Sequence, residues 1–199
     1  TIIVQGETSG ADSMVGTIVT ASGNVVFDFT DAEDTVVLSV ASDLTGVTDI
    51  DIQGGTVDFT ALGGGINSLA GVNITAASGS ILTGDQFLVA GNVGGLDHNL
   101  VLKLEAGDDV TAILSKLESA GVDLAELKVF APDELLTPAE KTALESLANT
   151  TVTDLDGDAV DTTNNAPILS FVETTEIQDT GNPVALTGNV VVVDAESNW

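Results

Sequence analysis

The sequence predicts a mainly β protein, with a solenoid-like or sandwich-like core and a small helical segment. Three observations support this fold class. Apolar residues alternate with polar ones in many short stretches bounded by Gly and Asp. A weak repeat of about 25 residues occurs between residues 44 and 90. A change to helical spacing follows Gly107, so the helical part is expected near the middle of the chain.

The alternating stretches carry the strand prediction. Residues 24–29 place Val25, Phe27 and Phe29 on one face, and residues 35–40 and 99–105 repeat the pattern. Successive side chains of a strand point to opposite faces, so this period of two is typical of strands with one buried face. A short apolar strand is also expected at residues 1–4.

The repeat suggests how these strands are connected. The tetrapeptide Leu44-Thr-Gly-Val47 recurs as Leu69-Ala-Gly-Val72, an offset of 25 residues. This length is typical of one coil of a solenoid, in which each repeat stacks on its neighbours. The coils would supply short strands at 49–52, 56–59, 73–75 and 86–89. The alternative is a sandwich or barrel whose hairpins resemble one another.

Two helices are predicted after Gly107. Asp108 or Asp109 can cap a helix whose apolar residues lie on one face at helical spacing, namely Val110, Ile113, Leu114 and Leu117. The sequence Thr137-Pro-Ala-Glu140 has the form of a capping box with Pro at the first helical position, so a second helix starts there. We expect these helices to cover an end of the β core, where free strand edges invite aggregation.

The charge balance excludes several partners. The chain has 31 acidic and 4 basic residues, all four of them Lys, for a formal net charge of −27. Binding to nucleic acid needs cationic side chains that displace counterions, and anionic membranes would repel this surface. No apolar run reaches the ~18 residues of a membrane span. Cysteine is absent, so disulfides cannot stabilise the fold. Divalent cations would relieve the self-repulsion.

The stretch 153–169 is the strongest candidate for such a cation. It carries four carboxylates within eight residues, followed by two amides. Calcium takes six to eight oxygen ligands of this kind. We therefore predict a calcium-stiffened linker; the alternative is a solvated acidic loop. The loop does not fit the EF-hand template, because Gly157 precedes the position at which that template needs glycine. The candidate oxygens come from Asp154, Asp156, Asp158, Asp161, Asn164 and Asn165.

The residues after this linker resemble a known group of proteins. Asn164-Asn-Ala-Pro-Ile-Leu169, Leu186-Thr-Gly-Asn-Val-Val191 and Asp194-Ala-Glu-Ser-Asn-Trp199 are similar to the opening of cadherin-like or VCBS-type repeats. Such repeats occur in large, acidic, secreted bacterial surface proteins, including calcium-dependent adhesins. Residues 44–59 also resemble segments of these adhesins and of S-layer proteins.

The resemblance implies a function for individual residues. It implies an Ig/cadherin-like β module at the end of the chain and calcium between modules, with Asp161, Asn164, Asn165, Asp194 and Glu196 as ligands. Asp154, Asp156 and Asp158 would supply an adjoining loop. Asn stands where the family usually has an acidic residue at 164–165, which weakens the expected site.

Other chemistry has less support in the sequence. His98 is the only histidine and follows Asp97, so we interpret the two as a surface pair without an assigned nucleophile. Zinc lacks further His or Cys ligands. Acidic pairs such as Asp49 and Asp51 could be written into a glycosidase mechanism, but among so many acids they arise by chance.

The predicted organisation has four parts: a β-rich domain at 1–105, a helical capping segment at 106–150, an acidic calcium-binding linker at 151–167 and the first strands of an incomplete cadherin-like module at 168–199. We expect a secreted, non-enzymatic structural segment of a bacterial adhesin, S-layer or filament at the cell surface. Its partners would be copies of itself or neighbouring modules, with glycans or abiotic surfaces as other candidates. One alternative is a filament subunit that exchanges strands between copies. Another is a calcium-dependent enzyme acting on polysaccharides.

Overall fold

The computed structural model describes residues 1–5, 11, 13–19, 22–65, 68–119, 123–162, 168–171 and 190–193. The chain divides into two compact units, Thr1–Thr162 and Thr163–Trp199. The mainly β prediction with a small helical part is confirmed: the first unit is built on two parallel sheets with a few helices. None of the described helices is both long and apolar enough to cross a membrane.

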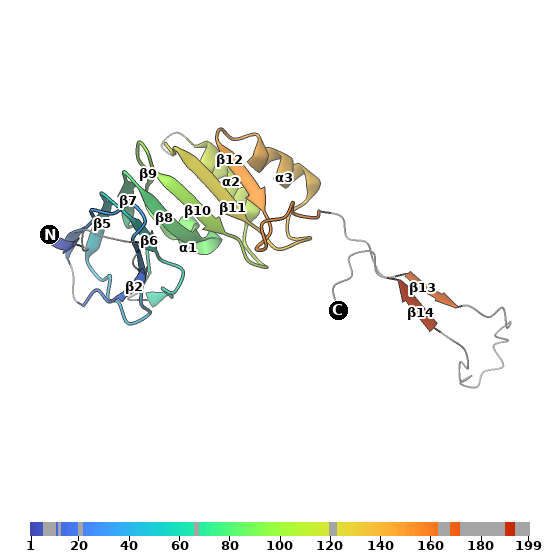
Figure 1. Cartoon of the computed structure of the whole chain (residues 1–199), viewed down its shortest axis with the longest axis horizontal. Coiled ribbons are helices and arrows are strands. Elements are labelled where there is room, and N and C mark those ends of the chain that lie inside the picture. Colours follow the sequence, from blue (N-terminus) through green and yellow to red (C-terminus); the bar gives the residue numbers. More distant parts are fainter. Residues whose placement is uncertain are drawn as a thin grey trace. The chain divides into compact units, whose positions relative to one another are not determined.

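Strands of the first unit alternate between the two sheets, and Figure 1 shows them stacked in chain order. The five-stranded sheet contains, in order, β1 (Ile2–Gln5), β3 (Gly23–Asp28), β5 (Val47–Ile52), β7 (Asn73–Ala76) and β9 (Val93–Gly94). The seven-stranded sheet contains β2 (Ser13–Gly16), β4 (Thr35–Leu38), β6 (Thr56–Asp58), β8 (Gly79–Thr83), β10 (Asn99–Lys103), β11 (Glu126–Phe130) and β12 (Thr150–Thr153). All pairs between described strands of these sheets are parallel.

Register places like residues above one another. In the five-stranded sheet, Val25 lies beside Ile50 and Ile50 beside Ile74, and all three side chains are fully buried. The spacing from Val25 to Ile50 is 25 residues, equal to the offset of the sequence repeat. The alternating residues therefore form continuous apolar columns between the sheets, which is the core that the sequence pattern predicts.

The repeated tetrapeptide forms the same turn twice. The N–H of Val47 donates to the carbonyl of Leu44 at 2.9 Å, and Val72 does the same to Leu69 at 2.9 Å. The glycines between them have positive φ angles, 85° at Gly46 and 74° at Gly71. A turn that needs positive φ at its third residue favours glycine there. The repeat thus marks equivalent turns in successive layers.

Three helices take the place of further strands in the second layer. They are α1 (Gly84–Val89), α2 (Val110–Glu118) and α3 (Pro138–Glu145), with α1 packed on α2 and α2 on α3. The predicted caps are confirmed: Asp109 caps α2, and Thr137 forms a capping box with Glu140. Segment 106–150 carries these two helices, and it also supplies β11 and the first residue of β12, which extend the seven-stranded sheet.

The prediction of a strand at 86–89 was wrong, because these residues belong to α1. Thr83 accepts a hydrogen bond from the N–H of Gln86, whose side chain bonds back to the N–H of Thr83 at 3.0 Å. The sequence Thr83-Gly-Asp-Gln86 has the capping-box form, and this local signal outweighs the apolar run that follows.

The second unit contains one described pair of strands. β13 (Ile168–Phe171) and β14 (Val190–Val193) pair in antiparallel fashion, with Ile168 beside Val193. Strands were expected at both places.

Candidate functional site

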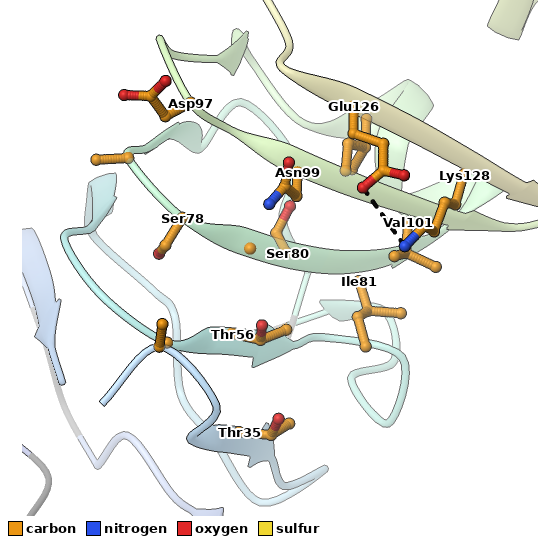
Figure 2. Close-up of a pocket in the computed structure, with 15 residues that line it drawn as sticks. Thr35, Thr56, Ser78, Ser80, Ile81, Asp97, Asn99, Val101, Glu126 and Lys128 are labelled. Atoms are coloured by element: carbon orange, nitrogen blue, oxygen red, sulfur yellow. Dashed lines mark ion pairs between the residues drawn. The ribbon is translucent and has the colours of Figure 1, made fainter. Parts of the chain in front are cut away.

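The outer face of the seven-stranded sheet carries a hollow of about 570 Å³ (Figure 2). Its lining comes from strands β4, β6, β8, β10 and β11 and from the loops before them. Thr35, Thr56, Gly79, Asn99 and Glu126 lie in one row across these strands, because each is the register partner of the next. A second row contains Asp58, Ile81, Val101 and Lys128.

Gly79 explains why the face is hollow at its centre. A Cβ atom at this position would lie 2.5 Å from Oγ1 of Thr56, so a side chain cannot be added without moving that threonine. The row is therefore interrupted between Thr56 and Asn99, and the space stays open.

The groove offers hydroxyl and amide groups more than charge. Thr35, Thr56 and Ser78 contribute hydroxyls and Asn99 an amide, while Lys128 and Glu126 form an ion pair of 3.4 Å at one end. Oγ of Ser78 is buried and has no hydrogen-bond partner among the described residues. None of the described residues that line the groove is aromatic. The groove can therefore exchange hydrogen bonds with a polar ligand but offers no ring for stacking.

His98 lies inside the core, so its interpretation as a surface pair with Asp97 was wrong. Its side chain has no exposed surface, and Nε2 lies 2.7 Å from Oγ of Ser80. Asp97 has a positive φ of 67°, and the chain turns there. Ser80 occupies an inward position between Val57 and Leu100, both fully buried. The sequence contained a signal for this placement, since Ser80 alternates with Leu82.

Burial controls the protonation of His98. It lowers the pKa of His98 to about 4, and the Gly94 backbone only partly opposes this shift. None of the described residues makes a hydrogen bond of ordinary geometry to Nδ1. The neutral imidazole bonded to Ser80 is therefore the stable form near neutral pH.

A Ser–His pair at this distance is also the arrangement of an activated nucleophile. Catalysis would need substrate access to the Ser80 hydroxyl and a group that orients the imidazole. Ser80 has no exposed surface. The pair therefore serves as a buried hydrogen bond in the core in this conformation.

The acidic loop is organised by one of its own carboxylates. Oδ1 of Asp154 accepts hydrogen bonds from the backbone N–H groups of Asp156 at 2.9 Å and Asp158 at 2.8 Å. Gly157 has a φ of 90°, and the N–H of Asp154 donates to the Asp158 carbonyl at 2.9 Å. An Asp that bonds backbone two residues ahead stabilises a turn. Asp154 thus acts as a turn residue here.

The predicted calcium ligands are only partly brought together. Asp156 and Asp158 are exposed on this loop, and the backbone N–H of Asp161 donates to Asp133 Oδ1 at 2.8 Å. Within the described part of the chain, no group of three or more acidic, His or Cys side chains could hold a metal ion. Asn164, Asn165, Asp194 and Glu196 lie outside the described residues. The described residues alone therefore do not make a complete calcium site.

Carboxylates on the five-stranded sheet are satisfied by neutral donors. Asp49 accepts from the Thr48 hydroxyl at 2.6 Å and from the Asn73 amide, one strand away, at 3.0 Å. These bonds, the one from Thr48 first, lower the pKa of Asp49. Asp51 accepts from Gln53 at 2.8 Å. The Asp49 and Asp51 pair therefore belongs to a network of amides and hydroxyls on the surface.

Comparisons with models of protein families, with curated proteins and with solved structures found no match to this chain.

Proposed function

We propose that this chain is a structural, non-enzymatic segment of a secreted bacterial surface protein, in which residues 1–162 form a β-solenoid. The observation that carries the proposal is the unbroken parallel ladder from β2 to β12, accompanied by the alternation of strands between two layers. Each layer contacts mainly its neighbours, as in repeat proteins whose stability comes from stacking. Such a ladder is a stiff spacer.

The core supports the same role. Most of its members are aliphatic or phenylalanine side chains, and they form one continuous cluster from Ile18 to Val160. Helices α1 to α3 continue the packing where the five-stranded sheet ends, since Phe87, Ile113 and Leu144 are fully buried. A shared core in every layer makes bending between layers unfavourable, because bending would open cavities.

Native-state hydrogen exchange tests the solenoid proposal. A continuous stack predicts slow exchange for the paired amides of both the all-β part (β3 to β8) and the helix-covered part (β10 to β12), with similar opening free energies. If β10 to β12 exchanged rapidly while β3 to β8 stayed protected, the two parts would be separate units. That result would exclude a single stiff spacer.

We also propose, as a separate and independent point, that calcium stiffens the linker at 151–167. The support is the clustered carboxylates of the sequence and its resemblance to adhesin junctions, with Asp154 shaping the loop. A bound ion would neutralise part of the local charge and stabilise the folded state by linkage. Residues beyond Thr162 would have to complete the coordination.

Thermal unfolding with calcium and with excess chelator tests this point. Calcium is expected to raise Tm, and Asp156→Ala and Asp161→Ala are expected to reduce that rise. Asp154→Ala is the internal comparison, because it removes two turn hydrogen bonds and should lower Tm with and without calcium. Equal melting curves in calcium and chelator would retire the calcium proposal without affecting the solenoid.

The groove on the seven-stranded sheet favours a second candidate function, binding of a neutral glycan. Its hydroxyl and amide lining and the unpartnered Ser78 hydroxyl support a ligand rich in hydroxyl groups. Titration with neutral polysaccharides should give binding that Thr56→Val weakens. Thr75→Val, on the other sheet, is the matched control. Binding that is unaffected by Thr56→Val would place the ligand elsewhere.

A further inference from the structure

The two ends of the stack of strands are finished differently. At the β12 end, Val152 is only 7% exposed although it lies on an edge strand, because α3 and the loop after β12 cover it with Leu144 and Val160. Lys141 holds this loop by donating to the Val160 carbonyl at 2.8 Å. The end formed by β1 and β2 has no comparable cover among the described residues.

Inward positions at the β1 and β2 end remain exposed. Ile2 is the register partner of Val25, and Met14 is the partner of Val36, and both partners are buried. Ile2 and Met14 nevertheless are each 36% exposed. Their side chains belong to the core columns, so the core opens to solvent at this end. The outward neighbours Ile3 and Val15 are 61% and 75% exposed.

This end is also free of charged side chains in its described part. Residues 1–5, 11 and 13–19 contain no Asp, Glu or Lys, in a chain of net charge −27. Free edge strands usually carry charged residues or proline that prevent pairing with another chain. Here both sheets present a free parallel edge, β1 in one and β2 in the other, without these protections.

We propose that this end docks on the same end of a second copy, so that the chain forms a symmetric dimer. Between described elements, only the β1 and β2 end presents free edges of both sheets together, whereas the opposite end presents β12 beside a helix. Like ends therefore match each other and unlike ends do not. In a two-fold arrangement the same patch serves both copies, so assembly stops at two.

Charge also favours this partner. Two copies of a strongly acidic chain repel each other at most surfaces, but an uncharged end brings no carboxylates into contact. Apolar side chains that are already aligned with the core would be removed from water on docking. Added salt should strengthen the dimer, because it screens the remaining repulsion between the two bodies.

Sedimentation of the full chain, with variants that add one negative charge, tests the proposal. The unmodified chain should be dimeric, and Ile3→Glu and Val15→Glu should each shift it to monomer, since like charges would meet across the two-fold axis. Both side chains point away from the core, so circular dichroism should show retained folding. Leu96→Glu and Leu155→Glu, at side chains 76% and 69% exposed elsewhere, should leave the dimer intact.

Three results would overturn the inference: a monomeric unmodified chain at every concentration and salt level, assemblies that grow beyond two copies, or dimers that survive both edge variants. A folded monomer would leave the solenoid proposal standing, because hydrogen exchange reports on stacking within one copy.

Discussion

The buried pair of His98 and Ser80 makes stability depend on pH in a defined window. Burial lowers the pKa of His98 from 6.5 to about 4 in the folded chain. Between these two values the unfolded chain binds one proton that the native chain does not, so the free energy of unfolding falls as the pH falls. The contribution of the neutral core histidine is fully present above about pH 6.5 and is lost by about pH 4.

The expected size follows from the shift. The lowering of about 2.5 units, from 6.5 to about 4, corresponds to ~3 kcal/mol at ~1.4 kcal/mol per unit. This is a large share of the stability of a typical domain. Carboxylates titrate at the lower end of the same window, so a comparison with a variant is needed to isolate the histidine.

Replacing both partners together supplies that comparison. In Ser80→Val with His98→Leu the polar pair is exchanged for apolar side chains, and no unpaired donor or acceptor remains. Denaturant unfolding of both proteins at several pH values should give a stability difference that moves by about 3 kcal/mol, in favour of the variant, as the pH falls from 6.5 to 4. A difference independent of pH would contradict the reasoning.

A direct observation is also possible because His98 is the only histidine. Its imidazole resonance in the folded chain should stay at the neutral position until the pH nears 4, and the resonance of the unfolded chain should titrate near 6.5. A folded-state midpoint near 6.5 would show that the side chain is hydrated, and the core placement of His98 would be refuted.

Two further predictions concern packing and capping. Gly54→Ala should destabilise the chain by ~3 kcal/mol or more, because the new Cβ would lie 2.0 Å from the Phe29 carbonyl oxygen, whereas Gly63→Ala should change stability by less than ~1 kcal/mol since nothing lies within 4 Å; equal midpoints in denaturant would refute the close contact. Lys116→Met should cost ~1–3 kcal/mol, because the ammonium group bonds the Ala90 carbonyl at 2.7 Å and the Phe87 carbonyl. Lys128→Met is the control with a change below ~1 kcal/mol, since its ion pair is about half exposed, and a similar loss in both variants would argue against the capping role.

Much of the fold followed from local patterns. Alternation identified the buried faces of β3, β4 and β10, because a strand with one buried side needs apolar residues at every second position. The Leu-x-Gly-Val repeat identified equivalent turns, since positive φ at Gly46 and Gly71 favours glycine. The caps at Asp109 and Thr137 were readable because capping involves only neighbouring residues. The capping box at Thr83 carried equal information and was overlooked.

Pairing between distant strands was decided only by the tertiary structure. Alternation is the same in a hairpin and in a parallel ladder, so the sequence did not distinguish a sandwich from two parallel sheets. Asp97 and His98 are neighbours in sequence, but a left-handed residue between strands directs His98 into the core beside Ser80, 18 residues away. The groove likewise joins outward side chains of five strands, and its hollow centre depends on the contact between Gly79 and Thr56. Composition determined that the chain is acidic and rich in strands, whereas register decided which residues meet, because register depends on packing across the whole stack.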